Sequence, residues 1–206
     1  MGIEPGEKPT LGPWKNFLER RTNAKEEVHI GLVGKYDLQD AYKSIRESLS
    51  QAGTYNDHKV VLKFINSEKL TEQNVSEELS GMDGIVICPG FGQRGTEGKI
   101  IAAHYTRTHD IPTFGICLGM QMIVVEFARN VLGYEDANSR ELDEKTSHNV
   151  IDIMEDQKDI TNMGGTMRLG QYECILKQGS RTFDIYKKEN IRERHRHRYE
   201  FNNQYL

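Results

Sequence analysis

The sequence predicts an α/β domain built on a doubly wound, mostly parallel sheet, and three observations favour that class. Short apolar runs alternate with amphipathic stretches, which is the pattern of β-α-β units. Glycines follow two of these runs, where the carboxyl ends of parallel strands border the ligand crevice of such folds. One run passes through Gly-Ile-Cys-Leu-Gly into an amphipathic helix, as the strand-to-helix turn of a nucleophile elbow does.

The composition restricts the class of protein further. A net charge of −4 over 206 residues argues against a general nucleic-acid binder, although basic residues gather near the C-terminus. No apolar run is long enough for a membrane span or a signal peptide, so we expect a cytoplasmic chain without a membrane partner. The spacing of the three cysteines indicates neither a disulfide framework nor a zinc site, and no metal is expected.

We expect residues 1–26 to form a linker and a short helix, the latter over residues 14–21, and residues 27–206 to form one domain. The β-α-β region follows. Gly31 and Gly34 lack the third glycine of a dinucleotide loop and are not followed by Gly-Lys-Ser/Thr, which disfavours a nucleotide site there. Strands are expected over residues 28–33, 59–65 and 84–88, and helices over 40–52, 72–79 and 99–109.

Cys117 is the candidate nucleophile. Gly115 and Gly119 flank it two positions away on either side, and small residues there permit a sharp turn that lifts the thiol above the sheet. A thiol at a helix N-terminus lies at the positive end of the helix dipole, which favours the reactive thiolate. The N–H of Leu118 is then a candidate oxyanion donor, and the helix is expected over residues 120–131.

A second glycine-rich loop, over residues 89–98, follows the strand next to the elbow. Such a loop brings backbone amides close to a ligand, and Gly90 is a candidate for a second oxyanion donor opposite Leu118. A flexible connection without function is the alternative.

The C-terminal third carries weaker signals. Strands are expected over residues 150–154 and 167–176, with a helical turn over 183–186. Glu141, taken alone, is typical of a solvated surface acid. The run Arg194-His195-Arg196-His197-Arg198 in an extended segment puts the histidines on one face and the arginines on the other. A catalytic histidine and a carboxylate-binding arginine are both compatible with this run.

These residues resemble a known family. Gly115-Ile116-Cys117-Leu118-Gly119-Met120-Gln121 resembles the elbow of class I glutamine amidotransferases. Two further strings, Gly164-Gly165-Thr166-Met167-Arg168-Leu169-Gly170 and Arg194-His195-Arg196-His197-Arg198-Tyr199-Glu200, are similar to those of the CTP synthase family in its glutamine amidotransferase domain. The similarity runs from about Trp14 to the last residue.

The resemblance implies roles for particular residues. Cys117 forms a glutamyl thioester and releases ammonia, with an oxyanion hole made by Gly90 and Leu118. The L-glutamine site is lined by Gly90 and by Leu118, Gly119, Met120 and Gln121; Glu141 binds the substrate's α-ammonium and Arg198 its α-carboxylate. GTP, the allosteric activator of the family, is expected at the loop with Arg94, Gly95 and Glu97.

The resemblance also implies what lies outside this sequence. ATP and Mg belong to a synthetase domain that aminates UTP to CTP, and full-length family members are homo-oligomers. The His-Pro-Glu string that completes the family's triad is missing from these residues, so we expect an incomplete domain, truncated at its C-terminus and inactive alone. Pro89 replaces a glycine of the family's Pro-Gly-Gly-Phe and has no N–H, which leaves Gly90 as the loop's oxyanion donor.

Two other functions stay open on the sequence. The chain could bind glutamine without hydrolysing it. It could also be a different Cys-elbow α/β hydrolase or redox protein, whose base would be His195 or His197.

Overall fold

The computed structural model describes residues 10–36, 41–154, 157–158 and 168–206. These fall into two compact units, one ending at Ile123 and the other beginning at Val124, and each is described by itself. None of the helices within the described ranges combines the length and the apolar character that a bilayer crossing requires.

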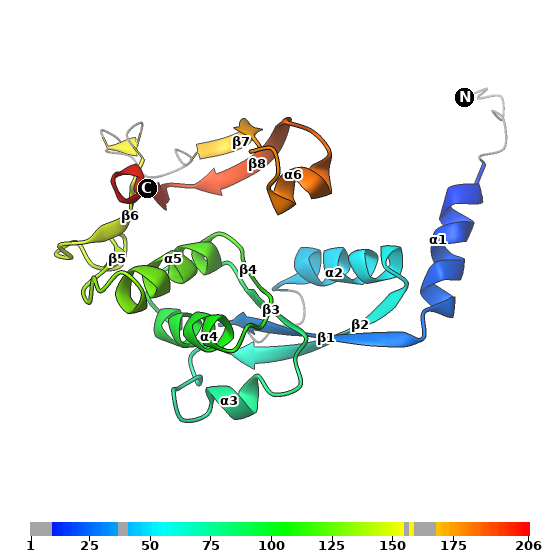
Figure 1. The fold of residues 1–206 in the computed structure, drawn as a ribbon, viewed down its shortest axis with the longest axis horizontal. Coiled ribbons are helices and arrows are strands. Elements are labelled where there is room, and N and C mark those ends of the chain that lie inside the picture. The colour runs from blue at the N-terminus through cyan, green and yellow to red at the C-terminus, as the bar shows by residue number, and fades with distance from the viewer. Residues whose placement is uncertain (1–9, 37–40, 155–156, 159–167) are drawn as a thin grey trace, which may run out of the picture. The chain divides into compact units, whose positions relative to one another are not determined.

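The first unit contains a parallel sheet of four strands in the order β2-β1-β3-β4 (Figure 1). Their bounds are Glu26–Gly34 for β1, His58–Asn66 for β2, Gly84–Ile87 for β3 and Thr113–Gly115 for β4. The carboxyl ends of β1 and β3 are aligned, because Val33 pairs with Ile87. The predicted parallel sheet is confirmed.

Helices cover both faces of this sheet, as a doubly wound fold requires (Figure 1). One face packs Leu32 and Val86 against α2 (Lys43–Tyr55), with Ile45 and Leu49 of the helix in the cluster. On the other face Ile87 packs against α4 (Thr96–Thr108) and the short α3 (Val75–Glu78). Alternate residues of each strand therefore face opposite helical layers.

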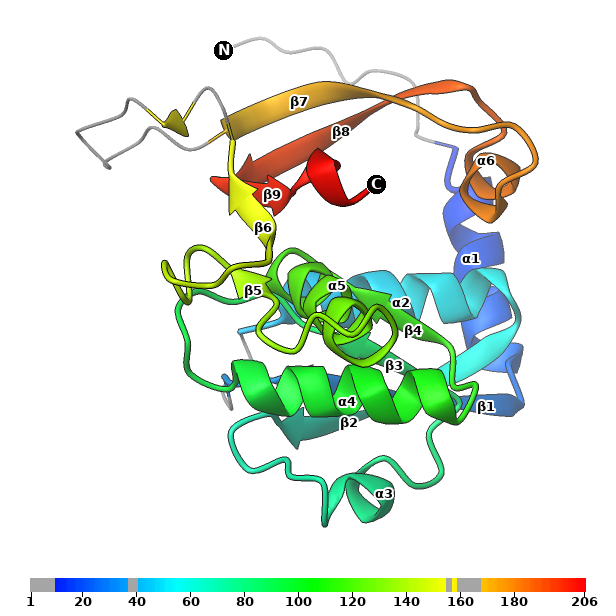
Figure 2. The ribbon, with the colours of Figure 1, turned by 60° about the vertical axis from the view of Figure 1, so that its left-hand side comes forward.

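The observed boundaries of three helices differ from the predicted ones. α4 begins at Thr96, three residues before the predicted start, because Gly95 adopts a left-handed conformation (φ 75°) directly before it. α3 is shorter than expected, and α2 begins at Lys43. Figure 2 shows α4 running alongside the strands of the first unit.

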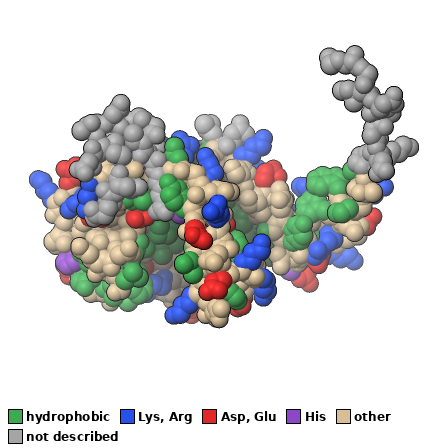
Figure 3. All heavy atoms as spheres, turned by 90° about the horizontal axis from the view of Figure 1, so that it is seen from above, with side chains coloured by type: hydrophobic (Ala, Val, Ile, Leu, Met, Phe, Trp, Pro, Cys, Tyr) green, Lys and Arg blue, Asp and Glu red, His purple; other side chains and the backbone are tan. Residues whose placement is uncertain are grey.

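The expected N-terminal helix is α1 (Gly12–Asn23). Trp14 stacks on Phe17 at a centroid distance of 5.4 Å, and Phe17 meets Tyr55 at the end of α2. Trp14 is nevertheless 58% exposed, and Figure 3 shows hydrophobic side chains gathered on the surface of this helix. One side of α1 therefore packs against the first unit, and another side is exposed.

The second unit receives the C-terminal part of α5 (Leu118–Asn130). A small sheet of β5 (Asn138–Ser139), β6 (Asn149–Ile153) and β9 (Tyr199–Phe201) follows. β7 (Arg168–Ile175) and β8 (Asn190–His197) form an antiparallel ribbon, with α6 (Arg181–Tyr186) between them and a 3-10 turn at Asn203–Tyr205. β5 and β9 were not predicted.

The alternation predicted for the arginine and histidine run is confirmed in β8. His195 pairs with Gly170 and Arg194 with Gln171, so the histidines and the arginines point to opposite faces of the ribbon. The rings of His195 and His197 lie 2.8 Å apart, from Nδ1 to Nε2. Most of the family-like string before β7, residues 164–167, lies outside the described residues.

Candidate functional site

Cys117 occupies the turn between β4 and α5, with a left-handed backbone conformation at φ 55°. Three other described non-glycine residues have positive φ: Asp57, Asp110 and Lys187. Each of those follows the end of a helix, where this conformation is a common way to stop. Cys117 precedes a helix instead, so its strain is not explained by helix termination and is typical of a nucleophile elbow.

The two flanking glycines allow the turn to fit. A Cβ on Gly119 would lie 1.9 Å from the carbonyl oxygen of Ile87, and one on Gly115 would lie 2.6 Å from the Met120 nitrogen. The Ile116 N–H donates to the Ile87 carbonyl at 3.0 Å. The first turn of α5 therefore rests directly on the end of β3, and only hydrogen side chains permit that approach.

The run after the nucleophile presents different groups at each position. Leu118 and Gln121 have buried side chains, Gly119 is buried, and Met120 is 38% exposed. The N–H of Leu118 is the first of α5 and, like the other N-terminal amides of a helix, has no acceptor one turn earlier in the helix.

Gly90 lies beside the elbow, as the sequence suggested. A Cβ there would meet Leu118 Cδ2 at 3.4 Å, Lys35 Cε at 3.3 Å and Lys99 Nζ at 3.5 Å. Gly90 and Leu118, the two expected oxyanion donors, are thus neighbours within one unit. A larger residue at 90 would push into both lysines and the leucine.

Lys99 is the feature of this site that sequence reasoning missed. It is 0% exposed and donates from Nζ to the Cys88 carbonyl at 2.6 Å. Burial lowers the pKa of Lys99 to about 8, and interactions with Cys88, Lys35 and Cys117 act on it as well. A signal was present: Lys99 shares one helical face with Ala102, Ala103 and Thr106, all of which are buried.

The loop expected to bind the effector is described in full. Arg94 donates to the Glu68 carboxylate at 2.6 Å, and its guanidinium lies over the Tyr36 ring, 5.9 Å from the centroid. Gly95 is left-handed before α4, and Glu97 is exposed in the first turn of that helix. The loop thus offers an exposed cation beside the N-terminus of a 13-residue helix.

Glu141 and Arg198 belong to the second unit. Glu141 is exposed after β5, and its N–H donates to Ser139 Oγ at 3.3 Å. Arg198 lies between β8 and β9, and its carbonyl accepts from the Met154 N–H at 3.2 Å. Burial raises the pKa of Tyr199; the Glu141 charge raises it further and Arg198 opposes this. Glu141 and Arg198 therefore lie within electrostatic range of the same hydroxyl.

A serine, a histidine and an aspartate also meet in the second unit, outside the sequence predictions. Asp136 accepts from Ser147 Oγ at 2.6 Å and from His148 Nδ1 at 2.7 Å, so both groups bind the same carboxylate. These bonds hold the pKa of Asp136 well below its usual range. Ser147 Oγ also lies 3.1 Å from His148 Nδ1, the same ring nitrogen that faces Asp136. In the triad of a hydrolase the serine and the aspartate instead contact opposite nitrogens of the histidine, so this cluster does not have that arrangement.

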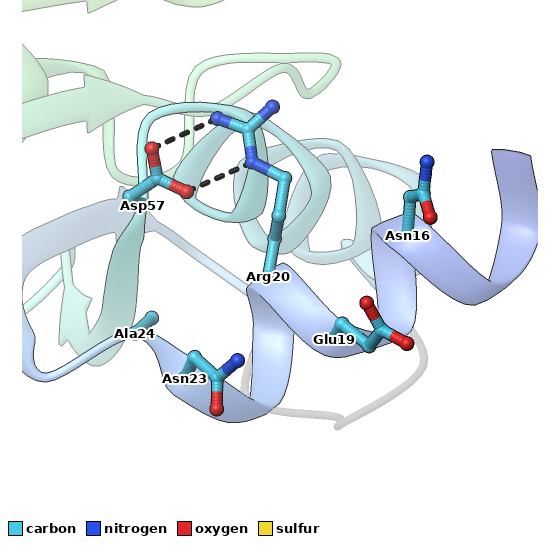
Figure 4. A pocket seen from close by; sticks show the side chains of 6 residues that line it. All are labelled: Asn16, Glu19, Arg20, Asn23, Ala24 and Asp57. Atoms are coloured by element: carbon cyan, nitrogen blue, oxygen red, sulfur yellow. Dashed lines mark hydrogen bonds and ion pairs between the residues drawn. The ribbon is translucent and has the colours of Figure 1, made fainter.

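Each unit has a hollow that is lined by described residues other than those of the elbow. The first has a volume of about 520 Å³ and lies beside α1 (Figure 4). There Arg20 donates to both carboxylate oxygens of Asp57, at 2.8 and 2.9 Å, which ties α1 to the end of α2. The second, of about 380 Å³, is lined by residues of β6, β9 and the C-terminal turn.

Comparisons with known proteins agree with the elbow and the sheet. A family profile described as glutamine amidotransferase class-I matches residues 37–206. CTP synthase of Bacteroides thetaiotaomicron is 72% identical over 207 residues, which cover 100% of this chain and 38% of that protein. CTP synthase of Porphyromonas gingivalis is 57% identical over 206 residues, with the same two coverages.

A solved structure agrees as well. The Trypanosoma brucei CTPS glutaminase domain with bound acivicin has a TM-score of 0.79 and 39% identity, covering 87% of this chain and 70% of that chain. This chain spans 38% of the length of the two bacterial relatives. It belongs to the class-I glutamine amidotransferases and, within them, to the glutaminase domains of CTP synthases.

Proposed function

We propose that this chain is the part of a CTP synthase that takes ammonia from L-glutamine. The observation that carries the proposal is the strained, half-buried Cys117 at the N-terminus of α5. Its thiolate attacks the side-chain amide carbon of glutamine, and the C–N bond breaks as a glutamyl thioester forms. The nitrogen takes up a proton, which the histidine of the family's His-Pro-Glu string would supply in the complete enzyme, and leaves as ammonia. Water then hydrolyses the thioester to glutamate and restores the thiol.

The oxyanion of the tetrahedral intermediate is stabilised by the amides of Gly90 and Leu118. Support comes from the close approach of these two residues beside Cys117. Pro89 contributes no N–H, so each side of the hole depends on a single amide.

Substrate recognition is assigned to the same elbow and to two charged residues. Leu118 to Gln121 line the site next to the nucleophile, while Glu141 binds the α-ammonium and Arg198 the α-carboxylate. One acid and one guanidinium together select a free amino acid over a peptide-bound side chain. Both groups lie within range of Tyr199 in the second unit, which is consistent with a shared role.

The ammonia is consumed elsewhere in the complete enzyme. A synthetase domain, with ATP and Mg, aminates UTP to CTP, and the enzyme works as a cytoplasmic homo-oligomer. GTP binds as an activator at Arg94, Gly95 and Glu97. The exposed Arg94 guanidinium, the adjacent Tyr36 ring and the N-terminus of α4 suit an anionic nucleotide.

Labelling with an electrophilic glutamine analogue, a chloroketone, tests the proposal. Cys117 should be modified faster than the other cysteines, as followed by peptide mass mapping, with acivicin as a second reagent. Cys88 is fully buried and its pKa is raised to about 12, so it should stay unlabelled. Cys174 is exposed and serves as the control for indiscriminate alkylation.

Excess L-glutamine should protect Cys117 and leave the labelling of Cys174 unchanged. Equal labelling of Cys117 and Cys174 without protection would remove the glutamine site. Oxidation of Cys117 by peroxide, with no response to either glutamine reagent, would favour a redox protein instead.

A further inference from the structure

Two buried lysines enclose the loop that carries Gly90. Lys99 is 0% exposed and Lys35 is 5% exposed, which is uncommon for a side chain that normally keeps its ammonium in water. Both donate to backbone carbonyls of this loop: Lys99 to Cys88 and Pro89, and Lys35 to Phe91. Both also approach Gly90 itself, through Lys99 Nζ and Lys35 Cε.

The contact of Lys99 with Pro89 fixes the direction of one N–H. In a planar trans peptide, the C=O and the following N–H point in opposite directions. The Pro89 carbonyl lies 3.5 Å from Lys99 Nζ, and no described peptide bond is cis. The Gly90 N–H is therefore directed away from Lys99. Since Pro89 has no N–H, this is the first amide that the loop can offer to a ligand after β3.

We propose that Lys99 is a positioning residue for the glutaminase reaction, an inference that rests on the proposed function. Its buried ammonium holds the loop so that the Gly90 N–H serves as an oxyanion donor, and its charge favours the Cys117 thiolate. Lys35 holds the same loop from its other end through the Phe91 carbonyl.

Lys99 Nζ and Leu118 Cδ2, in the residue after Cys117, would lie 3.5 and 3.4 Å from a Cβ on Gly90, so the ammonium lies close to the elbow. Three groups act electrostatically on Lys99. They are Cys88 at the end of β3, Lys35 after β1 and Cys117 at the elbow. Burial keeps Cys88 a neutral thiol at physiological pH, because its pKa is about 12. Lys35 is a second cation. Of these three groups, Cys117 alone can supply a negative charge opposite the two ammonium groups when it is deprotonated.

A purely structural lysine would behave differently from a positioning one. If Lys99 only connects α4 to the loop, its replacement changes the free energy of unfolding and leaves the reactivity of Cys117 in the folded protein unchanged. If it positions Gly90 and favours the thiolate, reactivity with a glutamine analogue falls and the pH dependence of the thiol moves.

The experiment compares variants of the 206-residue chain in a Cys174→Ser background. Lys99→Met removes the donor and the charge, Lys99→Gln keeps a donor without charge, and Lys99→Arg keeps both. Lys59→Met is the matched control, because Lys59 is an exposed lysine paired with Glu27 on β1. Two reagents are used on each: iodoacetamide, which needs only a thiolate, and the chloroketone glutamine analogue, which also needs the oxyanion donors.

For Lys99→Met we expect labelling of Cys117 by the chloroketone to slow roughly tenfold or more. The midpoint of its pH–rate profile with iodoacetamide should rise by about one pH unit. Lys99→Gln should share the shifted midpoint but lose less chloroketone reactivity, and Lys99→Arg should restore the midpoint. Lys59→Met should match the parent chain in both assays.

Near-UV circular dichroism verifies that each variant is folded, and Lys99→Gln decides the question if Lys99→Met is not. Parent-like rates and midpoints in the folded Lys99 variants would overturn the inference. A parent chain that reacts with iodoacetamide but not with the chloroketone would overturn the proposed function instead. In that case an unchanged midpoint in the Lys99 variants still refutes the role of Lys99, and a raised one supports its effect on the thiolate.

Discussion

Lys99 holds a charge in a buried site, and the cost of that charge depends on pH. Its pKa falls from 10.5 to about 8 because of burial. The unfolded chain then binds more protons than the folded chain between these two values, so stability rises with pH across that window. This contribution of Lys99 to the free energy of unfolding is fully present above pH 10.5 and is lost as the pH falls through about 8. We expect the folded protein to gain about 3 kcal/mol from this group across the window.

Denaturant unfolding of the parent and of Lys99→Met from pH 7 to 10 measures this gain, because subtracting the two curves cancels the other groups. Cys88 acts in the opposite direction: its pKa rises from 9.0 to about 12, so its contribution is fully present below pH 9 and is lost as the pH rises toward 12. A Cys88→Ala background removes that loss. A difference between parent and Lys99→Met that does not change with pH would contradict the prediction.

Glu141 and Arg198 carry the second prediction at this scale. On the proposed assignment, replacing either by alanine removes one charge-assisted contact to glutamine, which is worth about 1.5 to 3 kcal/mol. We therefore expect the KM for glutamine to rise roughly ten- to a hundredfold in an enzyme that contains the whole glutaminase domain. Arg140→Ala is a useful control, because that exposed arginine pairs with Asp152 in the same unit. Unchanged KM values in both variants would remove Glu141 and Arg198 from the site.

Among the elements, the junction of α5 with β3 leaves no room for a larger residue at Gly119. Gly119→Ala would place a methyl group 1.9 Å from the Ile87 carbonyl oxygen, which is backbone and cannot move aside. We expect the variant to lose about 2 to 4 kcal/mol of unfolding free energy and its Cys117 labelling.

Gly12→Ala is the control for the Gly119 variant, since nothing lies within 4 Å of a Cβ at Gly12 in α1. It should change the unfolding free energy by at most about 0.5 kcal/mol. Thermal unfolding of both variants, with labelling of Cys117, measures the two effects. A Gly119→Ala chain as stable and as reactive as the parent would mean that α5 does not need this contact.

The elements themselves could be predicted where periodicity is strong. The strands of the parallel sheet and the elbow followed from apolar runs and from two glycines at fixed spacing. Boundaries failed where one backbone angle decides, as at Gly95, whose left-handed conformation starts α4 three residues early. β5 has two residues and is too short to show any period. Lys99 was missed because a lysine is assumed to face solvent, although its neighbours in the helix pattern are buried.

For the molecule as a whole, the prediction concerns glutamine hydrolysis by residues 1–206 alone. We expect essentially no ammonia release, because the leaving group must be protonated and water activated, and no His-Pro-Glu occurs in this sequence. General acid–base catalysis contributes roughly a hundred- to ten-thousandfold per step. A longer chain that includes His-Pro-Glu should release ammonia, and its Cys117→Ala variant should not.

Measurement of ammonia with both lengths of chain decides this prediction. Rapid hydrolysis by residues 1–206 that depends on Cys117 would mean that a base lies within the sequence. His197 and then His195 would be the first residues to replace. The alternation of histidines and arginines in β8 could not have identified that base. It predicts which face of the strand a residue lies on, but not which groups that face contacts.

The exposed edge of the parallel sheet is a second property of the molecule that composition only hinted at. β4 is an edge strand, and Phe114 in it is 66% exposed in this chain. The apolar content of 36% is low for a domain that must cover both faces of a parallel sheet, and it is the hint that the composition gives. The sequence did not predict that Phe114 is exposed, because Phe114 lies in an apolar run that is typical of a buried strand.

The left-handed conformation at Cys117 means that the residue best suited to folding differs from the residue that the reaction needs at this position. Glycine occupies this conformation at no steric cost, whereas a residue with a side chain raises the free energy of the folded state by about 1 kcal/mol. A gene copy released from the need to hydrolyse glutamine should therefore drift toward glycine at position 117. A library randomised at this codon tests the idea: selection for solubility alone should enrich glycine. Selection of the complete enzyme for glutamine-dependent growth should recover cysteine.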